Sequence, residues 1–141
     1  MIQRIQTLWL ALAAICGGLS YYLPFYSGTR MMGEPPQPTP EVEMNSTFSV
    51  PIIIFMAIAV VGSIHALLSY SQRSRQFWVS LVCMISSIIA IVLLFMATSE
   101  FEGGGVRIES LVYFAVPVFL FMAAKGIRND EKLVKSMDRL R

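Results

Sequence analysis

His65 is the residue of this chain whose type and position most directly suggest chemistry. It is the single histidine, and it lies inside the apolar stretch "VGSIHALLSY". An ionisable side chain within a membrane is costly and marks a functional site by default. A lone histidine can also stay neutral and hydrogen-bond a hydroxyl, for which Ser86 or Ser87 is placed if neighbouring helices align. His65, Ser86 and Ser87 are therefore the candidate polar intramembrane site.

The sequence lacks the residue patterns that a metal site, a haem site or a redox-active cysteine pair would need. Cys16 and Cys83 lie in separate apolar runs without a CxxC spacing, and we interpret both as small core residues. A structural metal site needs more than these two cysteines and one histidine. A haem needs a second strong axial ligand, and the methionines are spaced as packing residues. We expect no metal and no cofactor.

The sequence also lacks a recognisable set of catalytic residues. No nucleophile stands beside a base, and the "GGG" at 103–105 follows acidic residues and precedes no lysine, unlike a phosphate-binding loop. No Asp or Glu interrupts an apolar stretch, as a proton or ion pathway would normally require. The sequence predicts a protein that is not an enzyme.

The composition indicates that the chain is embedded in a lipid bilayer. Of the 141 residues 55% are hydrophobic and 14% charged, and the mean hydropathy is +0.63. Soluble domains carry about 25% charged residues. The net charge of +2 is too small to suggest a nucleic-acid partner.

Four apolar stretches define the elements that must position these residues. A bilayer core needs about 20 helical residues, and the unbroken runs exclude barrel strands. We predict an all-α, four-helix transmembrane bundle over residues 1–126. Its spans are expected at about 5–26, 49–70, 77–98 and 110–126.

Two of these spans need an argument. The first continues too far to be a cleaved signal peptide, so we expect it to be retained. The fourth is short and contains Pro117, which should kink it, but Lys125 can extend its ammonium to the headgroups.

The connections differ in character. Residues 71–76 are short and basic, which predicts a tight hairpin between the second and third spans. Residues 27–47 contain four prolines between 35 and 40 and are expected to form an extended loop without a core. Residues 99–109 are expected to form a glycine-hinged turn.

Basic residues are distributed unevenly over the two sides. Nine of the eleven lie at the N-terminus, in the 71–76 loop, at Lys125 or in the tail after it; Arg30 and Arg107 lie on the other side. The positive-inside rule then places both termini in the cytoplasm of a multi-pass inner-membrane protein.

The tail, residues 127–141, is expected to be a short amphipathic cytoplasmic helix that begins after an Asn129 cap. Its surface partner is either the headgroup layer or another protein. The candidate lipid or partner contacts are Arg128, Lys132, Leu133, Lys135, Met137, Arg139 and Leu140.

Small residues four apart allow close approach of helix backbones. Four such pairs occur: Ala13 with Gly17, Ala14 with Gly18, Gly62 with Ala66, and Ser86 with Ala90. They either pack the bundle internally or form a face for another membrane protein.

Both ends of the chain carry a family resemblance. "MIQRIQTLWLALAAI" and "IRNDEKLVKSMDRLR" resemble the ends of a family of short bacterial inner-membrane proteins, domain of unknown function 4293. The resemblance implies four spans in the bacterial cytoplasmic membrane. It implies no activity and no site residue.

The function favoured by these patterns is a non-enzymatic scaffold or assembly partner, embedded in the bilayer and contacting another membrane protein. The alternative is a subunit of a small-solute transporter or channel that works as a homo-oligomer. Its polar stripe would consist of Ser63, His65, Ser69, Ser80, Ser86 and Ser87.

A topology reporter tests the predicted orientation. Alkaline phosphatase fused after Arg141 should be inactive and β-galactosidase at the same position active, because the basic side stays in the cytoplasm. Active phosphatase at this position would contradict the orientation.

Overall fold

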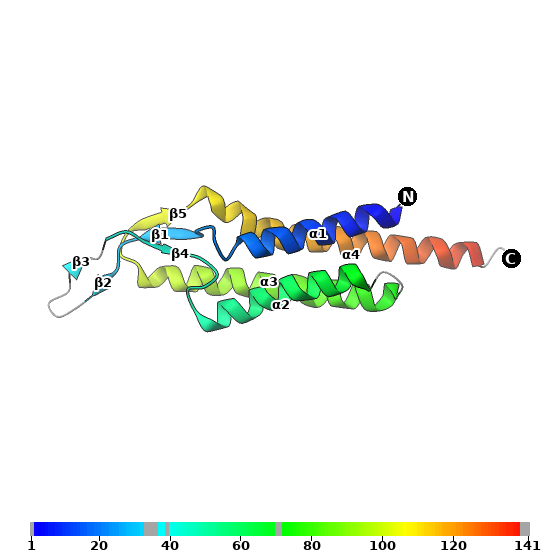
Figure 1. Ribbon diagram of the computed structural model, residues 1–141, viewed down its shortest axis with the longest axis horizontal. Coiled ribbons are helices and arrows are strands. Elements are labelled where there is room, and N and C mark those ends of the chain that lie inside the picture. Colours follow the sequence, from blue (N-terminus) through cyan, green and yellow to red (C-terminus); the bar gives the residue numbers. More distant parts are fainter. Residues whose placement is uncertain (1, 33–36, 39, 70–71, 139–141) are drawn as a thin grey trace.

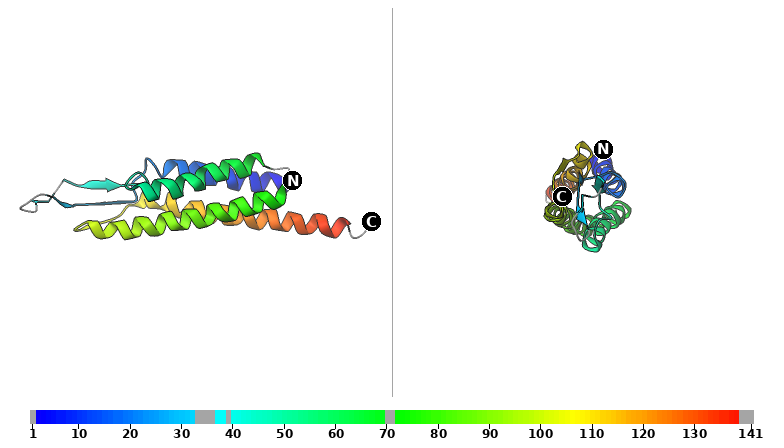
Figure 2. Two further views of the ribbon diagram at one scale, coloured as in Figure 1. Left: turned by 90° about the horizontal axis from the view of Figure 1, so that it is seen from below. Right: turned by 90° about the vertical axis from the view of Figure 1, so that its left-hand side faces the viewer.

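The computed structural model describes residues 2–32, 37–38, 40–69 and 72–138, with side chains for 5–30, 40–69 and 72–131. Four helices lie side by side in an elongated bundle (Figures 1 and 2). They are α1 (Ile2–Leu19), α2 (Val50–Leu68), α3 (Arg73–Ala97) and α4 (Leu111–Asp138). The N-terminus, the C-terminus and the connection between α2 and α3 share one end, called here the basic end (Figure 1).

Among the described residues, three segments of this bundle are long and apolar enough to cross a membrane. They are Val50–Leu68, Arg73–Glu100 and Ile108–Glu131, whereas the apolar part of α1, Ile5–Leu19, is shorter. The predicted helical class is confirmed for most of the chain. The predicted kink-prone fourth span is one uninterrupted helix that contains Pro117.

The predicted extent of the first span, 5–26, is wrong. α1 ends at Leu19, and the Ser20 hydroxyl donates to the Gly17 carbonyl at 2.7 Å. The Leu23 amide bonds back to the Leu19 carbonyl at 2.9 Å, and Pro24 follows, which cannot continue a helical ladder. The remaining apolar residues of the stretch enter a small sheet instead.

That sheet was not predicted. β1 (Tyr26–Gly28) pairs with β4 (Val42–Met44) and with β5 (Gly104–Val106), all antiparallel, in the order β4-β1-β5. β2 (Met31–Met32) and β3 (Gln37–Pro38) form a second antiparallel pair. The sheet lies at the end of the bundle opposite the basic end, called here the sheet end (Figure 1).

Glycines make the β1–β5 pairing possible. A Cβ at Gly28 would lie 2.3 Å from the Gly103 carbonyl oxygen, and one at Gly104 would lie 2.2 Å from the Ser27 carbonyl oxygen. Gly103 and Gly104 also have positive φ angles, +83° and +120°, which glycine adopts at no steric cost. The predicted glycine-hinged turn is confirmed, and two short 3-10 helices, Thr98–Glu100 and Ile108–Ser110, flank it.

Small residues pack the bundle internally. A Cβ at Gly17 would lie 2.6 Å from the Val60 side chain, and one at Gly62 would lie 2.2 Å from Cys83 Sγ, so α2 approaches both α1 and α3 closely at these points. Ala13, Ala66 and Ala90 are fully buried. Gly18 faces open space and makes no such contact.

The expected separate tail helix is also wrong. α4 continues without interruption through Asn129 to Asp138, so no new helix starts there. Ile127 and Asp130 are buried on the bundle side of this helix. These buried positions continue the α1–α4 contact beyond residue 126, which explains why the helix does not stop at the predicted boundary.

Paired glycine substitutions test the close contact of α2 with α3. Gly62→Ala should lower the thermal midpoint in detergent, because overpacking a core contact costs about 1–3 kcal/mol. Adding Cys83→Ala should recover stability by removing the sulfur. Gly18→Ala serves as the matched control and should not lower the midpoint; equal losses at Gly18 and Gly62 would contradict the packing.

Candidate functional site

The candidate polar site does not assemble. His65 is exposed on the outer face of α2, and its ring Nε2 lies 3.5 Å from the Ser69 hydroxyl one turn later. Ser86 and Ser87 are buried in α3. The expected hydrogen bond from His65 to either of them is therefore replaced by a contact within its own helix.

Buried serine hydroxyls are occupied by their own helices. Ser63 donates to the Ala59 carbonyl, Ser80 to Gln76 and Ser87 to Met84. Each of these serines uses its single hydroxyl donor on the preceding turn of its own helix and so donates to no neighbouring helix. Three serines of the stripe in the transporter alternative thus bond within their own helices, and His65 lies on a different surface.

Sequence reasoning missed the interhelical polar contact at the basic end. Gln6 in α1 donates its side-chain amide to a carboxyl oxygen of Asp130 in α4, and both side chains are only 6% exposed. Gly126 lies directly against this pair, since a Cβ there would be 2.9 Å from Gln6 Cγ. The spacing of four residues from Gly126 to Asp130 was the available signal, because it puts both on one helix face.

A second glutamine links the other two helices at the same end. Gln76 in α3 is 4% exposed, and its amide donates to the Ala66 carbonyl of α2 at 3.0 Å. Ala66 lies in the last turn of α2, where carbonyls lack an intrahelical partner. The side chain therefore satisfies a carbonyl that the helix leaves open.

Tyrosine closes the α1–α4 contact near the sheet end. The buried Tyr113 hydroxyl lies 2.6 Å from the Ser20 carbonyl and 2.7 Å from the Leu23 carbonyl, just after α1. The Ser20 and Ser46 hydroxyls are 2.9 Å apart and connect this point to the segment before α2. Phe25 packs edge-on against Tyr113, with ring centroids 5.2 Å apart.

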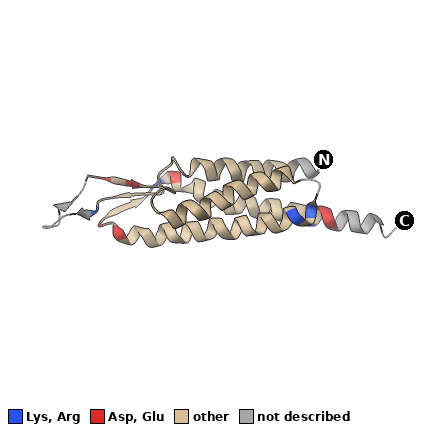
Figure 3. Cartoon of the chain, turned by 60° about the horizontal axis from the view of Figure 1, so that its bottom comes forward, with Lys and Arg blue, Asp and Glu red and all other residues tan. Residues whose placement is uncertain are grey.

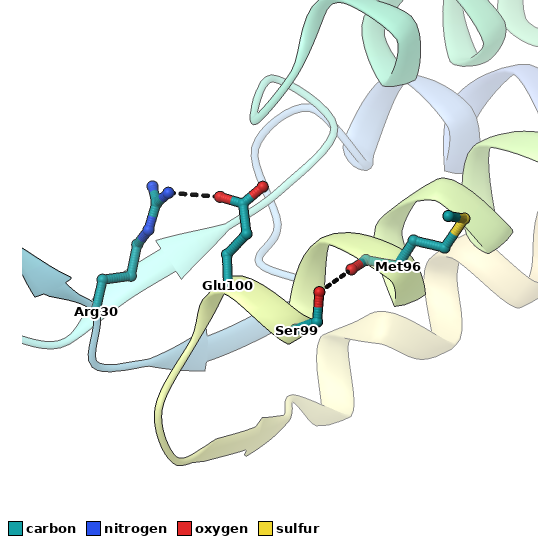
Figure 4. A network of polar contacts seen from close by, with 4 residues as sticks. All are labelled: Arg30, Met96, Ser99 and Glu100. Atoms are coloured by element: carbon teal, nitrogen blue, oxygen red, sulfur yellow. Dashed lines mark hydrogen bonds and ion pairs between the residues drawn. The ribbon is translucent and has the colours of Figure 1, made fainter.

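The sheet end carries an exposed ionic cluster around Arg30. Arg30 bonds Glu100 at the end of α3, as Figure 4 shows. The same guanidinium lies over Phe48 and Phe101, at 5.4 and 5.7 Å from the ring centroids. Beside it the Ser99 hydroxyl donates to the Met96 carbonyl (Figure 4). Arg30 thus ties the chain after β1 to the end of α3.

Charges of the described residues concentrate at the two ends of the bundle (Figure 3). Glu100, Glu102, Arg107 and Glu109 belong to the sheet end, where Arg107 Nε lies 3.5 Å from Glu109 Oε2. Arg73, Arg75, Lys125 and Arg128 belong to the basic end. Large hydrophobic side chains are exposed along the helices between them.

Of the predicted tail contacts, Arg128 is described and is exposed at the basic end. The side chains of Lys132, Leu133, Lys135, Met137, Arg139 and Leu140 lie outside the described residues. Within the described part of the chain, no group of three or more His, Cys, Asp or Glu residues could hold a metal ion.

The comparison with protein families decides the assignment. The family described as Domain of unknown function (DUF4293) matches residues 2–140. The chain belongs to this family. The resemblance of its two ends is therefore confirmed over nearly the whole sequence. No curated protein and no solved structure matches the chain. Membership in DUF4293 brings no activity with it, so a function must be argued from the residues themselves.

A double-mutant cycle tests the Gln6–Asp130 contact. Gln6→Leu should destabilise the bundle by about 2 kcal/mol, because it leaves a buried carboxyl without its donor. Gln6→Leu combined with Asp130→Leu should cost less than the sum of the single changes. Asn129→Ala is the control on an exposed neighbour. Additive effects in chemical unfolding would contradict the contact.

Proposed function

We propose that this chain is a four-span protein of the bacterial cytoplasmic membrane, with both termini in the cytoplasm, that acts without catalysis as a scaffold or assembly partner. Three long apolar segments and their exposed hydrophobic surfaces support membrane insertion. The shorter α1 is expected to span as well, because it packs along α4 and carries the Gln6 contact into the bundle.

The observation that carries the proposal is the length of α4. Its 28 residues from Leu111 to Asp138 form one helix, about 42 Å long at 1.5 Å per residue. A bilayer core takes about 30 Å of it. The last part of α4 projects beyond the other helices at the basic end (Figures 1 and 2).

A projecting helix favours a protein partner over the headgroup layer. An interfacial helix lies in the membrane plane, which would require a bend where the chain leaves the bundle. α4 has no break at Asn129, and the buried contacts of Ile127 and Asp130 hold it along the axis of the bundle. The arm formed by residues 132–138 is therefore directed away from the membrane.

Crosslinking in the native membrane tests the partner contact. A chain ending at Glu131 keeps the Gln6–Asp130 contact and removes the arm, so it is preferable to a shorter truncation. A photo-crosslinker incorporated at Lys135 should join the full chain to one defined polypeptide, identified by mass spectrometry.

Two controls make the outcome decisive. The triple change Lys132→Gln, Lys135→Gln and Arg139→Gln keeps a helix but removes the charge, so a photo-crosslinker at Met137 in that variant should lose the adduct. A photo-crosslinker at the lipid-facing Val82 should not capture the same polypeptide. Adducts restricted to lipid or to a second copy of the chain would contradict the proposal and favour the oligomeric alternative.

A further inference from the structure

A groove lies between α3 and α4 at the basic end. Its volume is about 360 Å³. Phe77, Leu81 and Met84 line it from α3. These positions are spaced by four and three residues, so they form one stripe along the helix. The stripe covers about 10 Å of helix length.

The α4 wall of the groove changes character along its length. Phe121 and Ala124 line the part nearer the middle of the bundle, and Lys125 and Arg128 line the part at its end. α3 and α4 run in opposite directions, so the Phe77 end of the α3 wall faces the two cations. The groove thus has an apolar channel along most of its length. Its end nearest the basic end of the bundle, called here the mouth, carries two positive charges.

The two cations are not neutralised within the described part of the chain, since neither takes part in an ion pair there. Both side chains are exposed. Trp78, 61% exposed, stands beside the mouth with its ring 5.8 Å from that of Phe77. Exposed tryptophan side chains are typical of the headgroup level of a membrane.

We propose that this groove binds an anionic phospholipid, with the phosphate headgroup at Lys125 and Arg128 and part of an acyl chain between Phe77, Leu81, Met84 and Phe121. Charge complementarity selects this occupant. An apolar helix of a partner protein would bury two uncompensated cations, whereas an anionic lipid places a negative group at the cationic end and hydrocarbon along the rest.

The larger groove on α2 provides a contrast. It has a volume of about 580 Å³ and is lined by apolar side chains together with His65, with no Lys or Arg. Nothing there distinguishes an anionic lipid from any other lipid. The proposal therefore applies to the groove between α3 and α4 alone.

Lipid titration followed by native mass spectrometry tests this site on the full-length chain in detergent. The probes are phosphatidylglycerol and phosphatidylcholine with identical acyl chains. The unaltered chain should bind phosphatidylglycerol more tightly. Lys125→Gln with Arg128→Gln should weaken that binding by about 30-fold, since each cation near an anionic headgroup contributes on the order of a five-fold gain.

Two further variants separate the groove from general surface charge. Arg73→Gln with Arg75→Gln removes the same charge from the same end of the bundle, outside the groove lining, and should change binding less than about threefold. Leu81→Trp fills the apolar channel while leaving both cations in place and should weaken phosphatidylglycerol binding comparably to the loss of the cations.

Three results would overturn the site. These are equal loss in both charge pairs, full binding by the Leu81→Trp chain, and displacement of the lipid by millimolar inorganic phosphate, which would identify a simple anion site. The inference rests on the proposed membrane insertion but not on a protein partner. A failed crosslink at the arm leaves the titration unaffected, and a failed titration leaves the crosslink unaffected.

Discussion

The contact between α1 and α4 is the interaction on which the rest of the bundle depends. With 18 residues, α1 is the shortest of the four described helices. α4 offers it polar partners near both of its ends. Gln6 bonds Asp130 at the basic end, and Tyr113 bonds the Ser20 and Leu23 carbonyls at the other. The first and last helices are therefore held in one register.

The fixed register of α1 against α4 also positions the sheet and the end of α4. Because α1 ends at Leu19 and Ser20 lies beside Tyr113, the chain enters β1 at a fixed height, where Phe25 packs on Tyr113. β1 then pairs with β4, from the same connection between α1 and α2, and with β5, from the connection between α3 and α4. At the opposite end Asp130 remains buried against Gln6, which keeps α4 helical past the bundle. The projecting arm and the sheet are thus two results of one helix pair.

The apolar spans were predictable because composition and run length alone decide them. The end of α1 was not, since residues 20–26 carry no charge and the turn depends on Ser20 and Leu23 meeting Tyr113 in space. The sheet escaped prediction for a similar reason. Its strands have three residues each, and pairing between residues 26 and 106 is a long-range event without a local pattern.

The candidate polar site was likewise predictable only in part. His65 was correctly identified as an unusual residue in an apolar helix, but its direction depends on how α2 is rotated in the bundle. Gly62, which packs against Cys83 on α3, sets that rotation and turns His65 outward. Asp130 falls within the predicted tail, residues 127–141, although its burial against Gln6 makes it part of the bundle. Sequence periodicity gives the faces of one helix, while the neighbour of each face comes only from packing.

A disulfide crosslink between α1 and α4 tests the central claim most directly. Gln6→Cys and Gly126→Cys are combined in a chain with Cys16→Ser and Cys83→Ser. The two new thiols then lie at neighbouring positions, since a Cβ at residue 126 would be 2.9 Å from Gln6 Cγ. Oxidation in native membranes should give an intrachain disulfide in most molecules, seen as a mobility shift without reductant. A matched pair at the exposed Leu8 and Met122 should stay reduced. An absent crosslink at 6 and 126, or one that joins two chains, would contradict the bundle described here.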